Sequence, residues 1–148
     1  MNRVIKFRGK SVIGKEWVYG SFVLCTHNAI ADICDIVTDN NDMTQTPVLS
    51  YTVGQFTGLC DINGREIYEG DIVRVKGNAV DKDFGVVMFH KNGYFYIDDS
   101  FGEFPRDCVK PIGDFFNSIS RNDFFQGMEF YVIGNVHDNK ELVPGNNK

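Results

Sequence analysis

The sequence predicts a mainly β protein, or a β-rich α+β protein. Several antiparallel hairpins are expected to form a small barrel or two barrel-like sheets, with at most one or two short helices. Three observations favour this class. Aromatic residues, which favour strands, are abundant, with 13 Phe, 6 Tyr and 1 Trp in 148 residues. Apolar and polar residues alternate in several short segments, and Asn-Gly dipeptides typical of tight hairpin turns lie between some of them.

The first hairpin is predicted near the N-terminus. RVIKFR (residues 3–8) alternates, which places Ile5 and Phe7 on one face of a strand and basic side chains on the other. Residues 9–14 are predicted to form a loop, and EWVYGSFVLC (residues 16–25) to form the second strand. The side chains expected on its buried side are Trp17, Tyr19, Phe22 and Leu24.

The next segments are less regular. The apolar positions of AIADICDIV (residues 29–37) fit either a strand or a short helix, and a strand is favoured. TDNNDMTQTP (residues 38–47) is polar and rich in turn formers, so it is predicted to be a surface loop that Pro47 closes.

Two Asn-Gly dipeptides mark hairpins in the centre of the chain. A two-residue type I′ turn at Asn63-Gly64 would place Asp61 directly opposite Glu66. Gly70-Asp71 is predicted to reverse the chain again, before a strand at residues 71–75 in which side chains alternate.

The second dipeptide, Asn92-Gly93, joins GVVMFH to YFYI. A two-residue turn there pairs Lys91 with Tyr94 and His90 with Phe95, and also pairs Phe89 with Tyr96.

The C-terminal third carries weaker patterns. Asp114 is predicted to cap a short helix that turns Phe115, Phe116 and Ile119 inward. EFYVIGNV (residues 129–136) is predicted to be the last strand, and Asp138 or Asn139 to cap a terminal turn over residues 140–142.

Length and composition predict one domain, 1–148, with subdomains of about 1–47 plus the C-terminal strand and 48–112 as an alternative. The four cysteines are irregularly spaced and no secretory signal is present, so we expect reduced thiols and a host-cell cytoplasmic protein. No apolar segment approaches the roughly 20 residues that span a bilayer, which predicts no membrane insertion.

Several motifs in order along the chain carry a resemblance to a known family. They are IKFRGK, WVYG, TVGQFTGLCDINGREIYEGDIV, GVV and VIGNVHDN. Together, from Ile5 to Leu142, the chain resembles the YopX family of phage and prophage proteins. The central block is the most specific part, whereas residues 25–47, 76–83 and 104–125 match no pattern. The resemblance implies a mostly β protein encoded by mobile elements and supplies no biochemical activity.

An acidic cluster, Asp61, Glu66, Glu69 and Asp71, lies within eleven residues. Carboxylates that a hairpin brings together could bind a divalent cation or act as acid and base. The structural alternative is favoured: aspartates at turns accept hydrogen bonds from turn amides, and Arg65 or the basic N-terminal strand neutralises the remaining charge.

A basic strand face is formed by Arg3, Lys6, Arg8 and Lys10, with Phe7 and Trp17 nearby in the sequence. Basic residues interleaved with rings can follow a single nucleic-acid strand. The favoured alternative is that these charges protect an exposed strand edge, or pair with the acidic second segment of the chain. The net charge of -5 also makes nucleic acid the less expected partner.

No motif predicts a cofactor, a metal or a catalytic residue. Cys25, His27 and Cys34 lack an evident fourth zinc ligand and the usual spacing. His90 and His137 have no recognisable nucleophile to form a triad. We therefore expect a non-catalytic module that binds a macromolecule, preferably a protein. The alternatives are a self-assembling structural or regulatory protein, and a metal-assisted hydrolase or nuclease that uses the acidic cluster.

Overall fold

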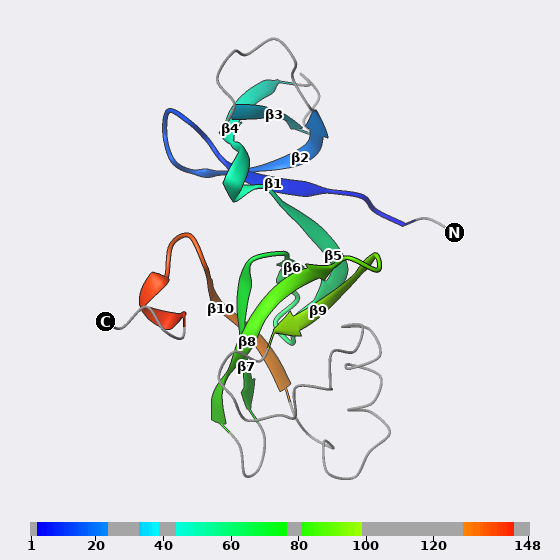
Figure 1. The fold of residues 1–148 in the computed structure, drawn as a ribbon, viewed down its shortest axis with the longest axis vertical. Helices are drawn as coiled ribbons and strands as arrows, with labels where there is room; N and C mark the ends of the chain where they lie inside the picture. Colours follow the sequence, from blue (N-terminus) through cyan, green and yellow to red (C-terminus); the bar gives the residue numbers. More distant parts are fainter. Residues whose placement is uncertain (1–2, 24–32, 39–43, 77–80, 99–128, 144–148) are drawn as a thin grey trace. The chain divides into compact units, whose positions relative to one another are not determined.

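The computed structural model describes residues 3–23, 33–38, 44–76, 81–98 and 129–143 (Figure 1). The chain divides into two compact units, Met1–Gly58 and Leu59–Lys148. Antiparallel strands make up two sheets, which confirms the predicted mainly β class. Neither sheet is a closed barrel. The predicted helix after Asp114 lies outside the described residues.

In the described residues, the first unit contains five strands and one short 3-10 turn. The strands lie in the order β4-β3-β2-β1-β5, and β5 continues into the second unit, where β6 follows it in the sheet. The elements are β1 (Phe7–Lys10), β2 (Trp17–Val23), β3 (Ile33–Thr38), β4 (Gln45–Leu49), η1 (Ser50–Thr52) and β5 (Gly54–Cys60).

The sheet of the first unit curls back on itself. An isolated bridge joins Ser11, just after β1, to Val48 in β4. Beside it, the Val12 N–H donates to the Pro47 carbonyl over 3.0 Å. Because this contact is one bridge and not a full ladder, the sheet is barrel-like without closing.

The curled sheet encloses a small apolar core. Cys34, Ile36 and Val48 are buried at its centre. Phe7, Val18 and Val53 pack around them. Gly9 allows the closest approach, because a Cβ there would lie 2.9 Å from Val48 Cγ2 and 3.2 Å from Ile36 Cδ1.

The predicted buried side of β2 is wrong in part. Phe7 pairs with Gly20 and Gly9 with Val18, so Val18 and Gly20 share the core face with Phe7. The alternation of side chains between the two faces continues through Gly20. A Cβ added at Gly20 would lie 1.9 Å from the Val37 carbonyl oxygen. Tyr19 therefore lies on the opposite face from Phe22.

Two other predictions for the first unit need correction. The first strand starts at Phe7 and includes Gly9 and Lys10, so it lies later than residues 3–8. Pro47 is inside β4 rather than at the end of a loop. A proline is tolerated there because β4 is the last strand of its sheet and needs no donor on its outer side. The strand favoured within residues 29–37 is confirmed from Ile33 onward.

The second unit is built on a four-stranded antiparallel sheet in the order β10-β7-β8-β9. Its elements are β6 (Glu66–Tyr68), β7 (Asp71–Lys76), β8 (Asp81–His90), β9 (Tyr94–Asp98), β10 (Glu129–Asn135) and η2 (Lys140–Leu142). Ile72 and Val73, neighbours in β7, are both fully buried, so this strand is covered on both faces. The other buried apolar residues in the described part of the unit are Ile67, Tyr68, Val86, Val87, Phe95, Phe130 and Val132.

The boundary between the units lies between residues 58 and 59, later than the alternative boundary near residue 47. The C-terminal strand β10 pairs with β7 in the second unit and not with residues 1–47. The terminal turn at Lys140–Leu142 is confirmed, but the predicted side-chain cap is wrong. Asn139 precedes the turn, and its Oδ1 accepts the Asn135 N–H instead. Among the residues described, no helix has the length and hydropathy needed to cross a membrane.

The contact of Gly9 with Val48 generates a stability prediction. Gly9→Ala should lower the free energy of unfolding by about 1–3 kcal/mol, because the methyl overpacks a fully buried valine. Val48→Ala should also destabilise the protein, since it leaves a cavity. The double variant should lose less than the sum of the two losses, because the new methyl fills the space that valine vacated. Urea unfolding followed by circular dichroism measures all three, and strictly additive losses would contradict this packing.

Candidate functional site

The acidic cluster begins at the turn between β5 and β6. The Gly64 N–H donates to the Asp61 carbonyl over 3.0 Å, and the Asp61 N–H donates to the Arg65 carbonyl over 2.8 Å. Gly64 has a φ of 79°, whereas Asn63 is not among the residues with positive φ. The turn is therefore a three-residue turn with a glycine bulge and not type I′. Asp61 lies opposite Arg65, so the predicted facing of Asp61 and Glu66 is wrong.

The Asp61 carboxylate is buried and organises its surroundings. Its Oδ1 accepts the N–H groups of Asn63 and Arg65, each over 2.9 Å. Its Oδ2 accepts the Val132 N–H of β10 over 3.0 Å. Beside it, the Ile62 N–H donates to the Phe130 carbonyl. The turn thus pairs with the outer edge of β10 as a neighbouring strand would. The Asp61 side-chain oxygen accepts the N–H that a backbone carbonyl of such a strand would accept.

The other three acids lie around Tyr68. Asp71 is fully buried, and its Oδ2 accepts the Tyr68 N–H over 2.8 Å. Glu66 Oε2 accepts the phenolic hydroxyl of Tyr68 over 2.7 Å. Glu69 is half-buried. The bond to Asp71 joins a side-chain oxygen to a turn amide, which is the kind of contact that the structural alternative expects for this aspartate.

A metal site would require several ligands to converge. Within the part of the chain that the structure describes, no three or more His, Cys, Asp or Glu side chains are placed so that they could hold a metal ion. All four acids of the cluster belong to that part. Cys34 is buried in the core of the first unit, while Cys25 and His27 lie outside the described residues.

The basic strand face is organised by aromatic rings of β2. The Arg8 guanidinium lies 4.5 Å from the centroid of the Trp17 ring, and Lys10 Nζ lies 5.4 Å from the same ring. Lys6 Nζ lies 5.8 Å from the Tyr19 ring. Arg3 is exposed and precedes β1. A cation and the aromatic face beneath it attract each other. This attraction contributes about 2 kcal/mol where water is excluded.

These cations do not protect an edge. β1 pairs with β2 on one side and with β5 on the other, so it is an interior strand. Arg8 is itself buried, with 3% of its surface exposed. The edge-protection explanation is therefore wrong for the strand itself. The ring contacts assign Lys6, Arg8 and Lys10 to the packing of the β1–β2 hairpin.

The β8–β9 hairpin combines exposed apolar side chains with partly exposed aromatic rings. His90 pairs with Tyr94, Phe89 with Phe95 and Met88 with Tyr96. The hairpin itself is confirmed, but the predicted pairing is wrong by one residue. The Gly93 N–H donates to the His90 carbonyl, and Gly93 has a φ of 87°. The three-residue turn with a glycine bulge recurs here.

This register decides which rings touch. The His90 ring stacks on Tyr94, with centroids 4.7 Å apart, and meets the edge of Tyr96 at 5.7 Å. On the other face, Phe89 and Phe95 form an edge-to-face pair at 5.0 Å. The Asn92 N–H donates to His90 Nδ1 over 3.1 Å, which braces the turn.

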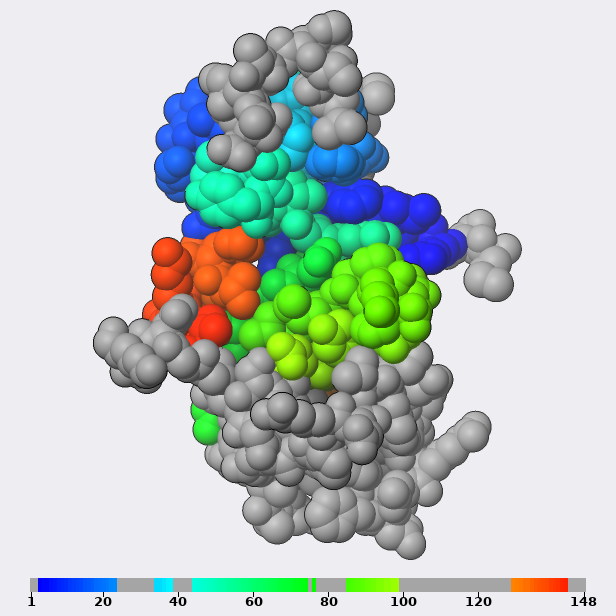
Figure 2. Space-filling model, viewed as in Figure 1, coloured from blue at the N-terminus to red at the C-terminus, as the bar shows by residue number. Residues whose placement is uncertain are grey.

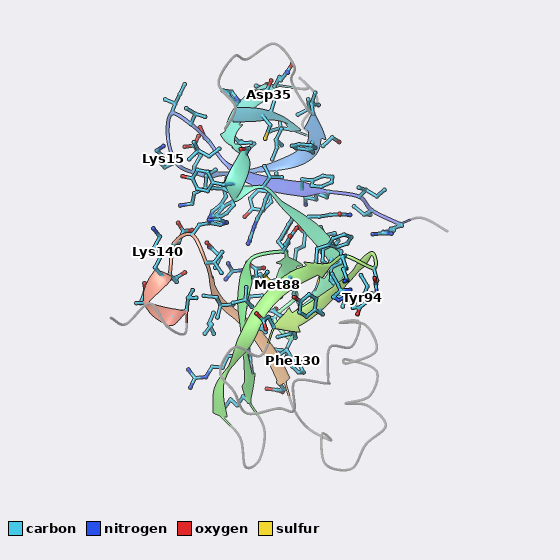
Figure 3. The ribbon with its side chains drawn as sticks, in the orientation of Figure 1. Lys15, Asp35, Met88, Tyr94, Phe130 and Lys140 are labelled. Atoms are coloured by element: carbon cyan, nitrogen blue, oxygen red, sulfur yellow. The ribbon has the colours of Figure 1, made fainter. Side chains whose placement is uncertain are left out.

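Among the described side chains of this hairpin, two apolar ones are exposed. Met88 is 39% exposed and Phe89 is 46% exposed, and as neighbours in a strand they point to opposite faces. Figure 2 shows the hairpin on the face in view, and Figure 3 labels Met88 on β8 and Tyr94 on β9. We call Met88, Phe89, His90, Tyr94 and Tyr96 the aromatic tip. This surface was not predicted from the sequence, although the run MFH before the turn and YFY after it indicated it.

Burial also affects the ionisation of Tyr96 at this tip. Desolvation raises the pKa of its phenol above the ordinary value of 10.0, and the nearby Asp98 carboxylate and Tyr94 raise it further. The neutral hydroxyl form is thereby favoured in the folded protein.

Together, the fold and these surfaces define an antiparallel β protein of two units with an aromatic hairpin in the second. The family model described as YopX protein matches residues 6–144, and the chain belongs to the YopX family. This confirms the resemblance carried by the sequence motifs. None of the curated proteins matches the sequence.

A solved structure has a similar fold. It is the crystal structure of protein EF1440 from Enterococcus faecalis, which is 24% identical in sequence to this chain. The comparison covers 96% of this chain and 99% of the other, with a TM-score of 0.54. At this level of identity the likeness concerns the fold.

The bonds of Asp61 predict a structural role that a substitution can test. Asp61→Asn should lower the free energy of unfolding by about 1–3 kcal/mol, because the amide NH₂ would face a backbone N–H donor and leave it unsatisfied. Urea unfolding measures the loss. Glu69→Gln is the matched control on a half-buried acid. If Mg²⁺ or Mn²⁺ stabilised the wild type but not the Asp61 variant, the carboxylate would be a metal ligand instead.

The raised pKa of Tyr96 gives a pH prediction with a defined sign. The phenol binds its proton more tightly when folded, so its contribution to stability is complete below pH 10 and declines as the pH rises through the folded pKa. Absorbance titration of the tyrosines should show a late-ionising component that disappears in Tyr96→Phe. A titration unchanged by that substitution would refute the hairpin environment described here.

Proposed function

We propose that this YopX-family chain is a non-catalytic accessory module of a phage or prophage. It acts in the host cytoplasm and binds a protein partner through the aromatic tip of the β8–β9 hairpin. The observation that carries the proposal is the exposure of Met88 and Phe89 on opposite faces of one hairpin. Exposed rings and methionines in a rigid element are typical of protein-binding surfaces.

The exposed side chains offer binding energy that the fold itself does not use. Full burial of a Met or Phe side chain contributes about 1.5–3 kcal/mol. With 39% and 46% of their surfaces still exposed, each can contribute on the order of 1 kcal/mol more when a partner covers it. A partner must enclose the tip from both sides to cover both, which favours a groove or a cleft over a flat surface.

The aromatic tip is also held in place before any partner arrives. Stacking of His90 on Tyr94 and the edge contact of Phe89 with Phe95 restrict their rotation. The ladder of β8 and β9 runs without a shift from Val86 to His90. Because these side chains are already ordered, binding costs less conformational entropy.

Charge favours a protein over a nucleic acid as the partner. The turn of the hairpin contributes one permanent cation, Lys91, and the chain carries a net charge of -5. Binding to phosphates usually shows itself as a basic excess and weakens steeply with salt. Apolar contacts at the aromatic tip are expected to depend only weakly on salt.

A site-specific crosslink tests this function. A photoreactive amino acid at Phe89 should capture a defined protein from the host, whereas the same group at Ile13, which is 88% exposed in the first unit, should not. Phe89→Ser should weaken binding of the captured protein by about fivefold, which corresponds to a loss on the order of 1 kcal/mol. Ile13→Ser is the control and should leave binding unchanged.

Two results would contradict the proposal. One is an identical set of crosslinked products from positions 89 and 13, which would mean that the aromatic tip selects nothing. The other is a salt-sensitive gel shift with nucleic acid that Phe89→Ser abolishes, which would assign the tip to a nucleic-acid partner.

A further inference from the structure

The sheet edges of this protein are protected in different ways. The outer side of β4 holds Pro47, whose carbonyl accepts the Val12 N–H, and Val48 is bridged to Ser11. The outer side of β10 receives the Ile62 N–H and the Asp61 carboxylate. Such features prevent a strand edge from pairing with another chain.

Strand β9, the end strand of the four-stranded sheet, has none of these features. Its sequence from Tyr94 to Asp98 is YFYID, with no proline, lysine or arginine. Its pairing with β8 shows no bulge that would twist it away. Among the described residues, no strand pairs with its outer side. A ring-rich edge without a bulge is a template for β-strand addition.

The turn between β8 and β9 determines which backbone N–H and C=O groups of β9 point away from β8. The His90 carbonyl accepts the Gly93 N–H, so His90 and its partner Tyr94 direct their backbone groups toward each other. Backbone direction alternates along an antiparallel strand. Tyr96 therefore also bonds to β8, whereas Phe95 and Ile97 direct their N–H and C=O groups outward.

We propose that β9 pairs antiparallel with β9 of a second copy of this chain, about a two-fold axis at Tyr96. Phe95 of each copy then exchanges two hydrogen bonds with Ile97 of the other, which satisfies the four outward groups of each strand. The two four-stranded sheets become one continuous sheet. This inference does not depend on the proposed binding function of the aromatic tip.

Side-chain character makes this edge self-complementary. Phe95 and Ile97 lie on the same face, so the two-fold pairing sets a ring against an aliphatic chain twice, and such cross-strand pairs are favourable. The face already contains buried Val87 and Phe95. Pairing therefore extends the apolar layer of the second unit across the two-fold axis.

Charge selects the antiparallel two-fold arrangement. Asp98 is the one charged residue of β9 and lies at its end. The two-fold axis places it opposite Tyr94 of the second copy. The two Asp98 residues are then four positions apart along the ladder, roughly 14 Å at the usual strand rise, which exceeds the screening length of about 8 Å at physiological salt. A parallel pairing in register would set the two carboxylates side by side, which is unfavourable.

A matched pair of charge substitutions tests this arrangement. Tyr94→Asp and Tyr94→Lys both remove the ring that stacks on His90. Only in the proposed dimer does the new charge face Asp98 of the other copy. Asp98 repels the new carboxylate of Tyr94→Asp and attracts the new ammonium group of Tyr94→Lys. The dimer Kd of Tyr94→Asp should exceed that of Tyr94→Lys by about tenfold, since each charge pair occurs twice. Sedimentation velocity across the micromolar range measures both.

A second pair of variants tests the hydrogen bonds. Ile97→Pro removes an outward N–H that pairs with no strand of the described residues. It should therefore abolish the dimer and preserve the β-sheet circular dichroism signal. Ile97→Val keeps the N–H and should still dimerise. The proposal is overturned if the wild type is monomeric throughout that range, if the two Tyr94 variants have equal Kd values, or if Ile97→Pro dimerises like Ile97→Val.

Discussion

The positive φ of two glycines, Gly64 and Gly93, is the constraint on which the second unit depends. Each glycine completes a three-residue hairpin turn, and the turn sets the register of the strands it joins. In the first hairpin, that register brings Asp61 opposite Arg65 and aims its carboxylate at β10. In the second, it stacks His90 on Tyr94. A side chain with a Cβ is disfavoured at both positions because of the left-handed backbone.

The sequence allowed the class, the family and most strands to be predicted, because these depend on local patterns. The hairpins around Asn63 and Asn92 and the alternation in β7 were all visible in residue order. Register was harder, because two-residue and three-residue turns share the Asn-Gly signal, and the choice changes which residues face each other. The strand that contains Pro47 was not predicted. A proline is tolerated in β4 because β4 is the end strand of its sheet, and this position is not visible in the sequence.

The candidate site shows the same limit. A cluster of four acids in eleven residues suggested chemistry, yet each hydrogen bond found for the Asp61 carboxylate joins it to a backbone N–H. One of those partners, Val132, is 71 residues away in the sequence, so no local pattern could reveal it. The role of the basic face likewise depends on a distant strand. β1 is an interior strand because β5, far along the sequence, pairs with its second side. The aromatic tip was the reverse case, because its residues were placed in a hairpin from the sequence but their exposure was not predicted.

The pairing of β10 with β7 also bears on how the protein is made. A ribosome delivers β7, β8 and β9 well before β10, because residues 129–135 come late in the chain. Until then, β7 pairs only with β8, and its other edge is open. That strand contains Ile72 and Val73, two apolar residues that are fully buried in the folded protein. Nascent chains should therefore pass through a period of aggregation risk that ends when β10 emerges. The strands of the first unit leave the ribosome first and can fold beforehand.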